Sequence, residues 1–65
     1  MMYLLKYYSR DGTMYRGEIR DDKTQARADY DAQQLFGRFV RAELWSGTYD
    51  NHAWSDGEML VSKTR

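Results

Sequence analysis

The sequence predicts a small two-layer α+β sandwich in which one helix packs on an antiparallel sheet, with elements in the order ββαββ. Three observations carry this prediction. In three segments, apolar residues alternate between the two faces of a strand, and an Asp-Gly pair separates the first two segments. A stretch without helix-breaking residues follows an aspartate. An SH3-like small β-barrel is the alternative, and it requires the helical interpretation to fail. Residues 1–65 are expected to form a single domain.

The first two strands are expected to form a hairpin, because residues 2–10 and 14–20 both alternate. A three-residue loop, Arg10-Asp11-Gly12, pairs apolar faces with each other and places Gly12 at the left-handed position of a bulged turn. Its partners are Tyr7 with Tyr15, Leu5 with Gly17 and Tyr3 with Ile19. A two-residue loop pairs Tyr7 with Arg16 and Leu5 with Glu18, so the apolar pattern favours the longer loop.

The helix is expected to follow Asp22 as N-cap, with Gln25 in a capping-box position, and to end at Gly37. At 100° per residue, its core face is predicted to hold Ala28, Ala32, Leu35 and Phe36. Tyr30 falls on the opposite face and is expected to be exposed. Beneath the helix we expect Tyr3, Leu5, Tyr7, Tyr15, Ile19, Val40 and Leu44.

Residues 38–45 alternate a third time, and residues 59–62 are expected to form a short last strand. Between them, residues 46–57 are either a long loop or a hairpin extension that turns near Asp50-Asn51. One helix covers only one face of such a sheet. The other face is predicted to show Met2, Leu4, Tyr8, Met14, Phe39 and Trp45 among charged residues. This surface is either an interface or a second small core sealed by residues 46–57 and the C-terminal tail.

The amino-acid composition makes several classes of function unexpected for this chain. Without cysteine, the chain has no disulfide and no thiolate metal site, and we expect neither a metal nor a cofactor. Ten basic and ten acidic residues balance, which disfavours a dedicated nucleic-acid binder. The N-terminus lacks the pattern of a signal peptide, and no apolar run is long enough to span a membrane. We therefore expect a cytoplasmic protein and, because the chain starts at methionine without a tag, a complete short gene product.

An enzyme is not expected. The single histidine, His52, has no nucleophile or oxyanion site placed beside it by any motif. Asp50, Asp56 and Glu58 lack the ligand spacing of a calcium loop, and no glycine pattern fits a phosphate cradle. A chain of 65 residues also leaves little room for an enclosed pocket. We find no motif specific enough to name a family.

The function predicted from these residues is binding of a protein partner. The chain is expected to be an inhibitor, adaptor or regulator of a larger protein, of the kind that phages and mobile elements encode, or to pair with itself as a homodimer. Large aromatics and arginine dominate binding hot spots, so the predicted contact residues are Trp45, Trp54, Phe39, Tyr49, Arg41 and Tyr30. The alternative is a nucleic-acid-binding sheet face that uses Arg16, Arg20, Arg41, Tyr8 and Phe39.

Overall fold

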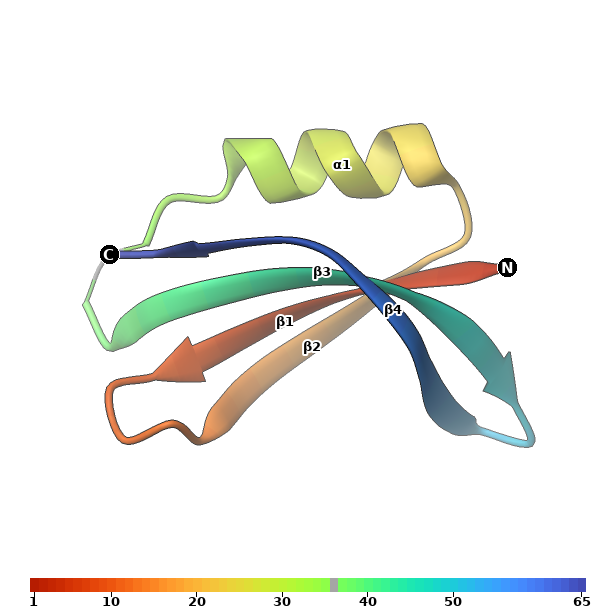
Figure 1. The fold of residues 1–65 in the computed structure, drawn as a ribbon, viewed down its shortest axis with the longest axis horizontal. Coiled ribbons are helices and arrows are strands. Elements are labelled where there is room, and N and C mark those ends of the chain that lie inside the picture. Colours follow the sequence, from red (N-terminus) through yellow and green to blue (C-terminus); the bar gives the residue numbers. More distant parts are fainter. Residues whose placement is uncertain (36) are drawn as a thin grey trace.

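The computed structural model describes residues 1–35 and 37–65. Its elements are β1 (Met2–Ser9), β2 (Met14–Arg20), α1 (Lys23–Ala32), β3 (Phe39–Asp50) and β4 (Ala53–Thr64). The strands form a four-stranded antiparallel sheet in the order β2-β1-β3-β4, and α1 lies over one face of it (Figure 1). The predicted α+β class and ββαββ order are confirmed. Because the helix is present, the SH3-like alternative falls away.

The predicted three-residue loop is confirmed, because Ser9 N–H bonds to the carbonyl oxygen of Thr13 and Tyr8 lies opposite Met14. Beyond this loop the register shifts by one residue. Tyr7 lies opposite Arg16, Leu5 opposite Glu18 and Tyr3 opposite Arg20, and Tyr15 is an extra, bulged residue. The predicted pairing of Tyr7 with Tyr15 is therefore wrong. The physical reason is that β2 is an edge strand, where the helix-side positions stay open to water and charged side chains cost little. Gly12 does take the left-handed conformation expected of it, at φ +88°.

The helix is shorter than predicted and turns a different face to the sheet. Asp22 is the N-cap, as predicted, and accepts a hydrogen bond from the backbone N–H of Gln25, whose side chain reaches forward to Asp29. Ala26 and Tyr30 are buried, whereas Ala28 and Ala32 are exposed. The predicted core face and the predicted exposure of Tyr30 are wrong, because turning one tyrosine ring inward buries more apolar area than two alanine methyl groups.

The end of the helix also differs from the prediction. The C-cap is Gln33 and not Gly37, although Gly37 is left-handed at φ +65°. Lys63 of β4 donates hydrogen bonds to the carbonyl oxygens of Tyr30 and Gln33, two of the last carbonyl groups at the helix end. Leu35 packs against the core from the connection to β3. Phe36, expected on the core face, lies outside the described residues.

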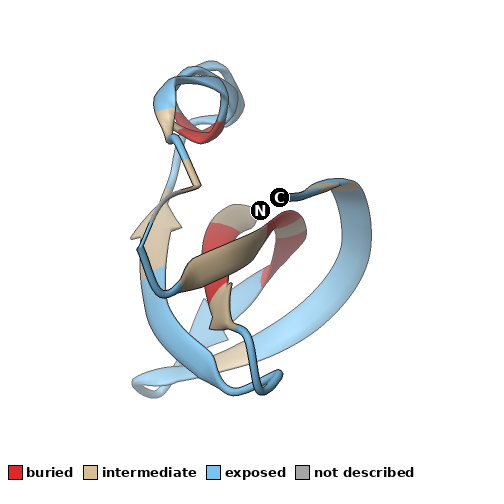
Figure 2. Ribbon diagram, turned by 90° about the vertical axis from the view of Figure 1, so that its left-hand side faces the viewer, coloured by how far each residue is buried: buried red, intermediate tan, exposed pale blue. Residues whose placement is uncertain are grey.

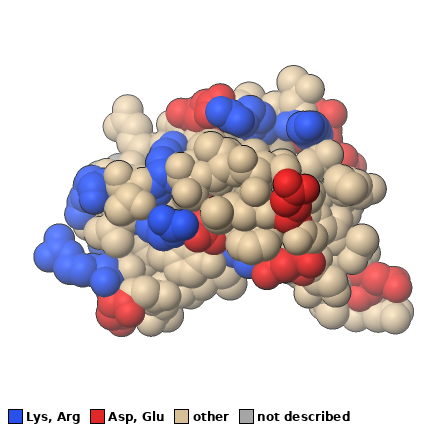
Figure 3. All heavy atoms as spheres, in the orientation of Figure 1, with Lys and Arg blue, Asp and Glu red and all other residues tan. Residues whose placement is uncertain are grey.

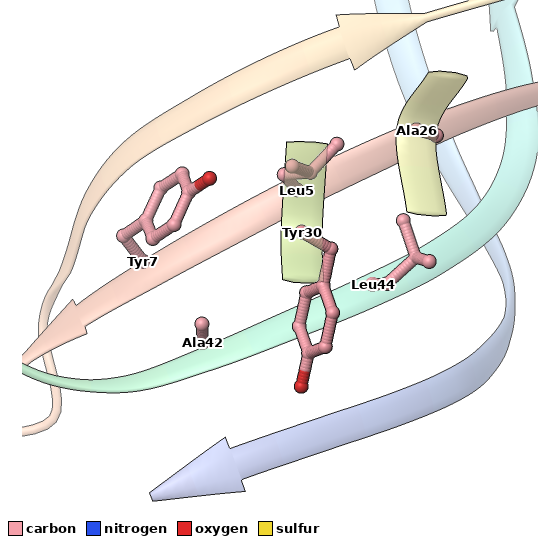
Figure 4. Packing of buried hydrophobic residues seen from close by; sticks show 6 residues of the cluster. All are labelled: Leu5, Tyr7, Ala26, Tyr30, Ala42 and Leu44. Atoms are coloured by element: carbon pink, nitrogen blue, oxygen red, sulfur yellow. The ribbon is translucent and has the colours of Figure 1, made fainter. Parts of the chain in front are cut away.

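The core lies between α1 and the central strands β1 and β3. Figure 4 shows its six buried side chains: Leu5, Tyr7, Ala26, Tyr30, Ala42 and Leu44. Figure 2 shows that the buried segments are the sheet centre and the inner side of α1. Leu5, Tyr7 and Leu44 confirm the predicted helix-side core. Tyr15 and Ile19 do not, because Tyr15 is 52% exposed and Ile19 lies opposite Leu4 on the other face.

The last two strands form a long hairpin in place of a loop and a short strand. Asn51 and His52 form its turn with φ of 51° and 60°, and positive φ at both turn positions is typical of a type I′ turn. Of the two predictions for residues 46–57, the hairpin extension is confirmed. The predicted last strand, residues 59–62, is too short. Bulges at Gly57 and Leu60 interrupt β4, and bulges increase local twist and bending.

A bulge at the start of β3 changes the face of Phe39. Ser9 pairs with Phe39 and Tyr8 with Arg41, so Val40 is the extra residue. Phe39 therefore packs against the helix-side core, 5.9 Å from Tyr7 between ring centroids, and the predicted faces of Phe39 and Val40 are wrong. The strand pattern could not show this, because one inserted residue reverses the alternation beyond it.

Candidate binding surface on the concave face

The sheet bends away from α1, so the face opposite the helix is concave. In Figure 1 the far halves of β3 and β4 turn downward to the hairpin tip, away from the helix. No second helix covers this face within the described residues. Three of its side chains are nevertheless buried: Leu4 at 6% exposure, Glu43 at 8% and Lys6 at 9%. The surplus apolar face predicted from the sequence is thus partly closed by its own curvature.

A chain of polar contacts crosses the concave face from β4 to β1. The indole Nε1–H of Trp54 donates to one oxygen of Asp56. The ammonium group of Lys6 lies 2.9 Å from the Asp56 carboxylate and 4.3 Å from the ring centroid of Trp45. Lys6 therefore joins the two tryptophans, since it forms an ion pair beside one and a cation–π contact with the other.

Glu43 continues this chain toward the other end of the face. Its carboxylate accepts hydrogen bonds from Trp45 Nε1 at 2.8 Å and from Arg41 Nε at 2.7 Å. Burial alone raises the pKa of Glu43, but the hydrogen bonds from Trp45, Arg41 and Tyr8 outweigh it and leave the pKa below its ordinary value. Hydrogen bonds from Lys6 and Trp54 likewise lower the pKa of Asp56. Both carboxylates are ionised at neutral pH.

Gly47 makes room for Trp54. The two strands approach so closely that a Cβ atom on Gly47 would overlap the backbone oxygen of Ser55 and the six-membered ring of Trp54. The six-membered ring of Trp54 thus lies next to Gly47, and Asp56 holds the indole at its Nε1. Both its position and its orientation are set before any partner arrives.

The outer part of the concave face is exposed and apolar. Tyr49 lies opposite Trp54 and Trp45 opposite Met59 across the β3–β4 ladder. Tyr49 is 44% and Met59 42% exposed, and both tryptophans are partly exposed. We call Trp45, Tyr49, Trp54 and Met59 the hairpin surface. Its residues come from two paired strands, so their spacing is fixed by the sheet.

The structure divides the predicted partner-binding residues between two faces. Trp45, Trp54, Tyr49 and Arg41 belong to the concave face, where Arg41 also donates to Thr64. Phe39 and Tyr30 lie on the helix side, and Tyr30 is only 3% exposed. A buried core tyrosine offers no surface to a partner, and Tyr30 is dropped from the candidate surface.

The residues of the alternative nucleic-acid face are not brought together. Tyr8 and Arg41 lie on the concave face, whereas Arg16, Arg20 and Phe39 lie on the helix side. Arg20 forms an ion pair with Asp29 at 2.8 Å, and Arg41 with Glu43 at 2.7 Å. Arg16 lies 3.8 Å from the Glu18 carboxylate, so all three predicted arginines have an acidic partner within the chain.

Sequence reasoning missed the residues that organise this face: Lys6, Glu43 and Asp56. One signal could have found two of them. Glu43 and Trp45, and likewise Trp54 and Asp56, are two positions apart on a strand, and such residues point to the same face. An acidic residue two positions from a tryptophan on a strand can accept the indole N–H. Lys6 gives no such local signal, because its partner is distant in the sequence.

The surface has two open hollows, one on each side of the sheet. One, of about 410 Å³, lies at the end of the concave face and is lined by Tyr8, Ser9, Arg10, Gly12, Val40, Arg41, Glu43 and Thr64. The other, of about 420 Å³, lies between α1 and β2 and is lined by Tyr7, Glu18, Arg20, Asp29, Ala32, Gln33 and Gln34. Within residues 1–35 and 37–65, no three acidic or histidine side chains gather as metal ligands do.

In the part of the chain that the structure describes, α1 is too short and polar to cross a membrane. Comparison of the chain with protein-family models, curated proteins and solved structures finds no match.

Proposed function

We propose that this chain is a small protein-binding module that acts as an inhibitor, adaptor or regulator of a larger protein. The observation that carries the proposal is the hairpin surface, where Trp45, Tyr49, Trp54 and Met59 lie together on two paired strands. Tryptophan, tyrosine and methionine are enriched where proteins bind one another, and the aromatic residues contribute most to hot spots.

The order of this surface supports the proposal. Association is weakened by every side chain that must be immobilised, at about 0.5–1.5 kcal/mol each. Trp45 and Trp54 are already fixed by the carboxylates of Glu43 and Asp56. A partner that packs against them loses little of its binding free energy to ordering.

The state of the carboxylates supports binding in preference to catalysis. A general acid or base works best when its pKa lies near the working pH. The pKa values of Asp29, Glu43 and Asp56 are all lowered, because each carboxylate accepts hydrogen bonds from its own chain. His52 stands at the exposed hairpin tip, where its positive φ serves the turn. We therefore propose a protein without enzymatic activity.

Affinity capture with surface variants tests the proposal. Wild type, Tyr49→Ala and Met59→Ala would be immobilised and exposed to lysate of the encoding organism. Tyr15→Ala is the matched control, since Tyr15 is a similarly exposed tyrosine at the opposite end of the molecule. We expect a protein that wild type and Tyr15→Ala retain and that Tyr49→Ala and Met59→Ala lose. A capture profile that is the same for all four proteins contradicts the proposal.

One observation favours a second candidate function, binding of single-stranded nucleic acid. In Figure 3 basic side chains gather at the left-hand end of the molecule, near the turn between β1 and β2. There Arg38 lies 4.1 Å and Arg16 5.7 Å from the ring centroids of Tyr15 and Phe39, respectively. Arginines beside exposed rings can contact phosphates while bases stack. A labelled single strand should then bind weakly at low salt and be released as salt rises. Binding that is absent at low salt, or unchanged by salt, excludes it.

A further inference from the structure

The two edges of the sheet differ in how well they could accept another strand. β4 carries bulges at Gly57 and Leu60, which bend it and interrupt the regular row of backbone groups. β2 is regular from Arg16 to Arg20, and its residues 14–17 are exposed. The open hollow between α1 and β2 also leaves the helix side of Glu18 accessible. β2 is therefore the edge that could accept a strand.

The charges along β2 complement a second copy of the same strand in one register. Arg16 and Glu18 both point to the helix side, opposite Tyr7 and Leu5. If two β2 strands pair antiparallel about Gly17, the Arg16 of each copy lies opposite the Glu18 of the other. The two-fold axis at Gly17 therefore relates two such Arg–Glu pairs. Opposite charges at directly opposed positions stabilise a strand pair. Arg16 and Glu18 already lie 3.8 Å apart within one chain, so the pairing extends this ion pair across the axis. Arg20 keeps its ion pair with Asp29.

Neighbouring registers fit less well. Pairing about Glu18 opposes Glu18 with itself and Arg16 with Arg20, so like charges face each other. Pairing about Ile19 leaves only residues 18–20 of β2 paired. Pairing about Gly17 spans β2 from Met14 to Arg20, with the bulge at Tyr15 near the end of each strand.

Gly17 itself is consistent with a close approach of two backbones. A glycine inside a strand weakens it and often marks a site where another backbone comes near. Gly17 does not have positive φ, and a Cβ atom there would meet the flexible end of Leu4 at 3.4 Å and lie 4.0 Å from the backbone oxygen of Leu5. The fold of one chain therefore gives little reason for a glycine at this position.

We propose that the chain forms a symmetric homodimer in which the β2 strands of two copies pair antiparallel about Gly17, giving a continuous sheet with both helices on one side. The contact lies on the opposite edge of the sheet from β4. It leaves the hairpin surface free, and its failure would not affect the proposed function.

A charge exchange tests the pairing. Arg16→Glu places glutamates opposite glutamates, and Glu18→Arg places arginines opposite arginines. Each variant alone should dimerise at least about tenfold more weakly than wild type. Mixed together, the two variants should form a heterodimer, and the double variant Arg16→Glu/Glu18→Arg should dimerise like wild type. Sedimentation equilibrium measures all four samples, and circular dichroism confirms that each is folded.

Cysteine cross-linking can identify the register of the β2–β2 pairing, because the chain has no cysteine of its own. Under mild oxidation, Gly17→Cys should form a disulfide-linked dimer much faster than Glu18→Cys or Ile19→Cys. A wild-type protein that stays monomeric at high concentration overturns the proposal. A dimer that is unaffected by the charge variants, or one that cross-links fastest through position 18 or 19, also overturns it.

Discussion

Replacing Glu43 by glutamine removes a charge from the concave face and keeps the shape of the side chain. In the wild-type protein, one carboxylate oxygen accepts from Trp45 and the other from Arg41. Glutamine can still accept from the indole, but its amide N–H₂ then faces the guanidinium group of Arg41, which can only donate. The variant thus tests the charged half of the contact.

The expected loss of stability in Glu43→Gln follows from the geometry of the contact. A hydrogen bond to a charged partner contributes about 1.5–3 kcal/mol when both groups are buried. Arg41 keeps 37% of its side-chain surface in water and can turn outward, so we expect a loss of about 1–2 kcal/mol. For a domain of this size, 1 kcal/mol corresponds to a shift of about 4–8 °C, so Tm should fall by about 5–15 °C at neutral pH.

The loss of stability in Glu43→Gln should depend on pH, and the direction of this dependence follows from the pKa of Glu43. The pKa of Glu43 is lower in the folded protein than its ordinary value. Its contribution to stability is therefore complete above the unfolded-state pKa and disappears as pH falls through the folded-state pKa. The difference in Tm between wild type and Glu43→Gln should be large near about pH 7 and should shrink as the pH falls below the unfolded-state pKa.

The assay is thermal unfolding followed by circular dichroism at neutral pH and in acid. Glu58→Gln is the matched control, because Glu58 is exposed on β4 and its carboxylate forms no ion pair within the described residues. Equal Tm values for wild type and Glu43→Gln at neutral pH would refute the reasoning. A difference that persists unchanged in acid would refute it as well, since it would then have no link to the charge.

Three further substitutions test other parts of the fold. Tyr30→Phe should raise the free energy of unfolding by about 1 kcal/mol, because the buried hydroxyl has no hydrogen-bond partner among the described residues. A lower free energy of unfolding in urea would show that the hydroxyl does have a partner. His52→Gly should raise Tm by a few degrees, because histidine at φ 60° is strained by about 1 kcal/mol and glycine is not; an unchanged or lower Tm would contradict the type I′ turn. Gly47→Ala should lower the free energy of unfolding by about 2–3 kcal/mol, since the new Cβ overlaps Trp54 and Ser55. A free energy of unfolding equal to that of wild type in the same chemical unfolding would contradict the packing of Trp54 over Gly47.

The fold class could be predicted because local signals agreed with each other. Strand alternation, the glycine turn at Gly12 and the N-cap at Asp22 each depend on neighbours in the sequence, and each is confirmed. The helix end could not be predicted in this way. Lys63, a residue 30 or more positions away, donates to carbonyl groups at this end, so Gly37 was the only local candidate.

The candidate surface was predicted in part. Aromatic character pointed to Trp45, Tyr49 and Trp54, which do lie on one surface. Phe39 was placed on the wrong face because the bulge at Val40 leaves no trace in the alternation of the strand. The strand order also lay beyond the sequence pattern. Without it, β2 could not be recognised as an edge whose charges remain in water.

The indole N–H signals of the two tryptophans test most directly whether the concave face is held as the structure shows. Trp45 donates to Glu43 and Trp54 to Asp56, and the pKa of each carboxylate is lowered. In a pH titration followed by nuclear magnetic resonance, both indole signals should shift with midpoints below about 4, the ordinary carboxyl pKa. Two indole signals that do not change with pH, or that exchange with water as fast as free tryptophan, would contradict the account.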